Sequence, residues 1–91
     1  MASYAKKVYS FDLGRVVDRT KNPHPYGEID IDFRFKKAEN PRARKWTYAC
    51  TVRTLKGAMK EIERMSEELG RGGEYRIVDV SNGKILKKVK R

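Results

Sequence analysis

The chain has 91 residues and a formal net charge of +10 at pH 7, so it can build one hydrophobic core but not several domains. Its apolar content of 38% is too high for a disordered polyelectrolyte, and its single cysteine excludes an internal disulfide and favours a reducing compartment. No apolar run approaches the length of a membrane span and no signal-peptide pattern opens the sequence, so a cytoplasmic protein without membrane contact is expected.

The first predicted element is a strand over residues 6–18. Apolar residues alternate with polar ones from Tyr9 to Leu13, and two adjacent valines then break the alternation. A β-bulge at Gly14 would shift the phase of one strand in this way. Residues 19–27 contain two prolines and a glycine and are predicted to form a loop.

A β-hairpin is predicted in the middle of the chain. Residues 28–36 and 45–53 each alternate strictly between apolar and polar positions, and the turn formers Asn40 and Pro41 lie between them. A register slip of one residue would expose every apolar side chain. One register that meets this condition pairs Lys37 with Arg44, and a slip of two residues would keep the same faces. It forms four pairs on the buried face: Phe35 with Trp46, Phe33 with Tyr48, Ile31 with Cys50, and Ile29 with Val52.

The other face of residues 28–36 is predicted to be solvated. It carries Glu28, Asp30 and Asp32 at one end and basic residues at the other. Alternate strand positions lie about 6.5–7 Å apart, which is wide for carboxylates that share one cation. We therefore expect no metal site here.

An amphipathic helix follows the hairpin. Apolar residues recur with helical spacing from Leu55 to Leu69, Thr54 can cap the first turn, and Gly70 can end the helix. The buried face of the hairpin is the expected partner of the apolar stripe of this helix.

The last predicted element is a second hairpin. Asn82-Gly83 is a strong two-residue turn signal, and such a turn would place Arg76 opposite Val89. The lysines of the final strand suit a sheet edge. The predicted fold is therefore α+β, in the order β-β-β-α-β-β: an antiparallel sheet with a single amphipathic helix on one face. It forms a single small basic domain, in which residues 83–91 are an edge strand or a basic tail.

The surplus positive charge is concentrated in two segments. Residues 34–45 hold six cations and one acid, and residues 84–91 hold five cations and no acid, whereas residues 1–33 are neutral. Charge concentrated in this way produces a local positive field. The predicted nucleic-acid contacts in the hairpin are Arg34, Lys36, Lys37, Arg42, Arg44 and Lys45, and those in the tail are Lys87, Lys88, Lys90 and Arg91.

Both segments also have a structural interpretation. Hairpin ends are commonly charged because they are solvated, and basic tails also serve solubility. Nucleic-acid binding is favoured if both segments lie on one side of the molecule, because their positive fields then combine.

Other chemistry has little support in the sequence. His24 lies between two prolines in a loop, Cys50 falls on the apolar face, and the glycines of residues 70–73 follow a helix rather than open one, which is the wrong end for a phosphate loop. The four hairpin aromatics could stack bases, but the helix needs a partner, so they are predicted to be core. Of these, Trp46 and Phe35 are expected to be partly exposed. We expect no enzyme, cofactor or metal.

Residues 6–69 resemble in outline the arm-type DNA-binding domains of phage integrases. The resemblance is carried by three strands before a helix and by the run RKWTYACTVRTLKGAMKEIERM, where a strand leads directly into the helix. The resemblance implies no contact residues for this chain. The terminal hairpin and the acidic residues within 28–32 differ from the pattern of these domains.

The expected function is non-enzymatic binding of nucleic acid, DNA or RNA, through phosphate contacts with weak sequence specificity. The alternative is a small interaction or inhibitor protein, phage-derived or from another mobile element, that docks an acidic protein surface. A homodimer formed through an edge strand is compatible with either.

Overall fold

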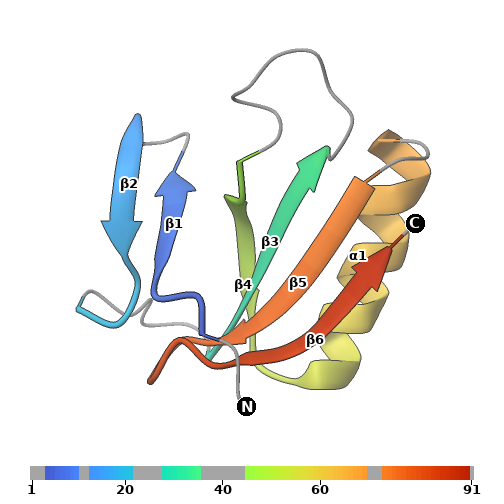
Figure 1. Cartoon of the computed structure of the whole chain (residues 1–91). Coiled ribbons are helices and arrows are strands. Elements are labelled where there is room, and N and C mark those ends of the chain that lie inside the picture. The colour runs from blue at the N-terminus through green and yellow to red at the C-terminus, as the bar shows by residue number, and fades with distance from the viewer. Residues whose placement is uncertain (1–3, 11–12, 22–27, 36–44, 70–72, 91) are drawn as a thin grey trace.

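The computed structural model describes residues 4–10, 13–21, 28–35, 45–69 and 73–90. Within these ranges the chain forms one helix and several strands (Figure 1). In chain order the elements are β1 (Lys7–Ser10), β2 (Arg15–Asp18), β3 (Ile29–Phe35), β4 (Thr47–Val52), α1 (Leu55–Leu69), β5 (Gly73–Asp79) and β6 (Ile85–Lys90). No helix in these ranges is long and apolar enough to cross a membrane.

The strands form one six-stranded sheet in the order β2-β1-β4-β3-β5-β6. Neighbouring strands are antiparallel except β1 and β4, which are parallel where Tyr9 pairs with Thr47. Helix α1 contacts β3, β4 and β5. The predicted α+β fold with one helix on one sheet face is confirmed. The predicted strand count and the purely antiparallel sheet are corrected.

The extra strand lies within residues 6–18, where β1 and β2 are two antiparallel strands rather than one bulged strand. Ser10 at the end of β1 pairs with Arg15 at the start of β2. Gly14 has a φ of +66°, and its N–H donates to the Ser10 carbonyl oxygen over 2.8 Å. Glycine adopts this left-handed conformation without steric cost. The break in the apolar alternation therefore marks a turn.

The pairing of β3 with β4 is as predicted at one end and shifted at the other. A β-bulge in β4 accounts for the difference, because one extra residue moves all the preceding side chains to the other face. The predicted partners of Phe35 and Phe33 are therefore wrong, and Trp46 and Tyr48 lie on the face opposite α1. The observed pairs are Ile29–Val52, Ile31–Cys50, Asp32–Tyr48 and Phe33–Thr47.

The main core lies between α1 and the sheet. Its buried residues come from both layers: Ile31, Tyr75 and Ile77 from the strands, and Ala58, Ile62 and Met65 from the helix. The helix begins as predicted, because the Thr54 side-chain oxygen accepts a hydrogen bond from the Gly57 N–H over 3.0 Å. Gly70, the predicted end, lies outside the described residues.

The predicted hairpin of β5 and β6 is present, and β6 is an edge strand as expected. Its loop is longer than two residues. The Asp79 N–H donates to the Lys84 oxygen over 2.9 Å and the Gly83 N–H to the Asp79 oxygen over 2.7 Å, so residues 80–83 form the loop. The register is also shifted, because Arg76 pairs with Lys88 rather than Val89.

Candidate functional site

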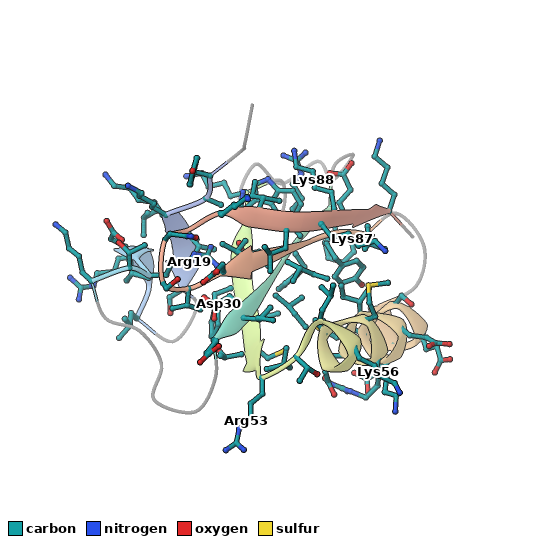
Figure 2. The ribbon with its side chains drawn as sticks, turned by 90° about the horizontal axis from the view of Figure 1, so that it is seen from below. Arg19, Asp30, Arg53, Lys56, Lys87 and Lys88 are labelled. Carbon is teal, nitrogen blue, oxygen red and sulfur yellow. The ribbon has the colours of Figure 1, made fainter. Side chains whose placement is uncertain are left out.

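The sheet face opposite α1 is charged, and much of it is buried. Asp30 and Asp32 of β3 lie on this face and are 1% and 0% exposed. The prediction that they share a solvated face with Glu28 is wrong, and only Glu28 is exposed. The reason is Arg19, which directly follows β2, is 3% exposed, and lies beside Asp30 (Figure 2).

Asp32 is the centre of a buried ionic network. Arg19 binds it through two nitrogens, with Nη1–Oδ1 and Nη2–Oδ2 distances of 3.1 and 2.6 Å. Nε of Arg76 donates to Oδ2 of Asp32 over 2.6 Å. Arg19 also binds Asp30 over 3.1 Å, and the Thr51 hydroxyl donates to the other Asp30 oxygen over 2.7 Å.

The charges within this network balance, since two carboxylates meet two guanidinium groups. Buried ions are tolerated when they are paired and their hydrogen bonds are satisfied. Burial lowers the pKa of Arg76 from its usual value, and the Asp32 carboxylate opposes this effect. These two arginines therefore contribute little to the external positive field.

A second ion pair fixes Arg34, the first cation of the basic hairpin segment. Its Nε and Nη2 both lie 2.8 Å from Oε2 of Glu74 on the neighbouring strand β5. The Arg34 guanidinium carbon is also 4.4 Å from the centre of the Trp46 ring, and that of Arg76 is 4.5 Å from it. Each arginine is thus held by a carboxylate and contacts the same indole. Each of these cation–π contacts stabilises the fold by about 0.5–2 kcal/mol.

A hollow of about 260 Å³ lies next to this indole. The strand register explains which charged residues lie around the hollow. Glu74 pairs with Lys90, and Arg76 pairs with Lys88, across β5 and β6. The lysines therefore continue the charged face to the sheet edge. The residues that line the hollow are Arg34, Trp46, Glu74, Tyr75, Lys88, Val89 and Lys90.

Lys88 and Lys90 are exposed cations of this face. Within the described part of the chain, no ion pair involves either of them. Lys87 lies on the other face, because it pairs with Ile77 of the core, and Figure 2 shows Lys87 on the helix side and Lys88 on the opposite side.

The structure thus brings three of the predicted site residues together: Arg34, Lys88 and Lys90. It places Lys87 on the opposite face, and Lys45 is exposed just before β4. The remaining predicted contacts fall outside the described residues, namely Lys36, Lys37, Arg42, Arg44 and Arg91.

Sequence reasoning missed the role of Trp46, Glu74 and Arg76. The alternation predicts Trp46 in the core, because a bulge leaves no obvious mark in it. Glu74 and Arg76 do carry a signal, since they alternate with Tyr75 and Ile77 and complement the alternating charges of β3. Arg19 lies in a turn after β2, where no periodicity could reveal it.

Cys50 is half-buried against the helix side of the sheet, in agreement with its predicted position on the apolar face. Burial, and secondarily the Glu61 carboxylate, raises the pKa of its thiol. Because the thiolate is the reactive form, native Cys50 is expected to react with a disulfide reagent at neutral pH several-fold more slowly than in the unfolded chain. Rates measured with and without denaturant test this, and equal rates would contradict it.

In the described part of the chain, no group of three or more His, Cys, Asp or Glu residues could hold a metal ion. No protein-family model matches the chain, and neither a curated protein nor a solved structure matches it. The resemblance to integrase arm domains is therefore not supported by a match, and four strands rather than three precede α1. Geometry and charge carry the functional interpretation.

Proposed function

We propose that this chain is a non-enzymatic module that binds nucleic acid through the phosphate backbone with weak sequence specificity. One observation carries the proposal. Arg34 begins the basic segment 34–45, Lys88 and Lys90 belong to the basic tail, and all three line the same hollow. The first residue of one basic segment therefore lies beside two lysines of the other, which supports a shared binding surface.

The pairing of the remaining charges supports this proposal. Arg19 and Arg76 are neutralised by buried carboxylates, and Glu74 is engaged by Arg34, so it repels a phosphate less than a free acid would. The ammonium groups of Lys88 and Lys90 remain exposed beside the hollow. Clustered exposed cations contact phosphates and release counterions, which favours binding at low salt.

The test compares two double variants with the same change in charge. Lys88→Gln/Lys90→Gln alters the proposed surface, and Lys56→Gln/Lys60→Gln alters exposed lysines of α1. Binding of a labelled oligonucleotide is followed by fluorescence anisotropy at several salt concentrations. We expect the first variant to bind more weakly and to reduce the slope of log K against log [salt] by about 1.4–1.8, at 0.7–0.9 per phosphate contact.

The helix variant is expected to keep the wild-type slope. Equal losses in the two variants would mean that net charge alone drives binding, and the proposed surface would be wrong. The single variants Lys87→Gln and Lys88→Gln refine the comparison, because these adjacent lysines lie on opposite faces of β6.

A further inference from the structure

We propose that the hollow beside Trp46 receives an unstacked base of a single-stranded nucleic acid while Lys88 and Lys90 contact its phosphates. This inference rests on the proposed function and adds the form of nucleic acid that the site prefers. It follows from three properties of the hollow: an aromatic wall, a charged rim and a fixed geometry.

The aromatic wall is Trp46, which is half-buried and lines the hollow. Indole rings on a sheet surface are the platforms on which single-stranded nucleic acids stack their bases. The bulge in β4 is what places this ring on the charged face instead of in the core. Tyr48, two residues further along, faces the same side, but its hydroxyl is bonded to Thr51 over 2.7 Å within the buried network.

Trp46 is held in place from several directions. Its carbonyl oxygen accepts a hydrogen bond from the Tyr9 N–H over 3.2 Å, which ties it to β1. Its ring contacts two guanidinium groups, which Asp32 and Glu74 fix in turn. A ring fixed in this way loses little freedom when a base stacks on the part of it that faces the hollow and that the two guanidinium groups leave uncovered, so more of the stacking energy contributes to affinity.

The rim suits a single strand better than a duplex. Lys88 and Lys90 occupy alternate positions of an edge strand, about 6.5–7 Å apart, and so form a short cationic track beside the aromatic wall. A duplex keeps its bases stacked inside and must spend energy to extrude one. A single strand offers its base and its phosphates to the site together.

Trp46 is the only tryptophan of the chain, so its fluorescence reports directly on the hollow. The intact protein is titrated with a single-stranded oligonucleotide as DNA and as RNA, with the duplex of the same sequence, and with inorganic polyphosphate of similar charge. We expect both single strands to change the emission and to bind more tightly than the duplex. Polyphosphate is expected to bind without changing the emission.

Two variants separate stacking from charge. Trp46→Ala is expected to weaken single-strand binding by roughly 5- to 150-fold at an unchanged salt slope, as for the loss of one stacked base. Trp46→Phe keeps an aromatic ring and is expected to lose less. Circular dichroism confirms that each variant is folded, and the wild-type titration decides the matter if Trp46→Ala is not.

The outcomes distinguish this inference from the function on which it rests. Equal affinity for single strand and duplex, without a change in Trp46 emission, would overturn the inference and leave phosphate binding intact. Absence of binding to every polyanion would overturn both. Polyglutamate that matches the single strand in affinity and in emission change would also overturn the inference and would favour an acidic protein partner.

Discussion

Replacing Asp32 with asparagine is expected to lower the free energy of unfolding by about 3–5 kcal/mol. The carboxylate of Asp32 accepts hydrogen bonds from Arg19 and Arg76 and is 0% exposed. Its loss would leave two largely buried guanidinium groups with only Asp30 nearby. Domains of this size have about 5–15 kcal/mol of stability in total, so the loss is a large fraction. Urea unfolding followed by circular dichroism measures it.

Glu67→Gln provides the control, because Glu67 is an exposed carboxylate on α1. Its expected effect is within about 0.5 kcal/mol, as for most surface substitutions. A loss below about 1 kcal/mol for Asp32→Asn would contradict this account. It would mean that the two buried guanidinium groups do not need the Asp32 carboxylate.

Gly83→Ala is expected to cost about 2–5 kcal/mol. Gly83 has a φ of +76°, which costs a residue with a side chain about 1–2 kcal/mol. A Cβ there would also lie 2.7 Å from Cγ of Lys6 and 3.1 Å from its Cα and N atoms. Crowding of packed atoms adds about 1–3 kcal/mol, because the segment before β1 must move and its Ala5–Gly83 hydrogen bond of 2.6 Å is disturbed.

Gly14→Ala isolates the first contribution, the cost of the left-handed backbone conformation. Gly14 has a similar φ of +66°, but no described heavy atom outside its chain neighbours would lie within 4 Å of a Cβ there. Its expected cost is the backbone term alone, about 1–2 kcal/mol. If thermal and urea unfolding gave equal losses for the two variants, the close approach of Lys6 to Gly83 would be wrong.

Local patterns predicted the elements that face the main core. The alternation of residues 28–36, the helical spacing after Thr54 and the turn at Asn82-Gly83 each identified an element that is present. The apolar residues of β3 and α1 repeat with the period of their own element, and the turn has its own residue signal, so a single sequence is enough to detect them.

The second buried face could not be predicted in the same way. Asp30 and Asp32 have the pattern of a solvated face, and ion pairs with Arg19 and Arg76, which are distant in sequence, make their burial tolerable. The bulge in β4 places the side chains of Trp46 and Tyr48 on the face opposite α1, and no glycine or proline marks it in the sequence. Both features depend on tertiary pairing and not on local periodicity.

These same features form the candidate site. The bulge brings Trp46 to the charged face, the buried carboxylates hold the arginines that contact it, and the edge position of β6 exposes Lys88 and Lys90 beside it. The segments that sequence reasoning identified as basic supply charge. The tertiary pairing fixes the position of the indole.

The most direct test of the proposed function is a salt titration of the intact protein with duplex DNA. If six to eight cations contact phosphates, log K is expected to fall with log [salt] with a slope of about −5 to −7, at about 0.9 per contact. A slope near zero, or no binding at low salt, with the duplex and also with single-stranded DNA and RNA would contradict the proposal that the two basic segments serve a polyanion.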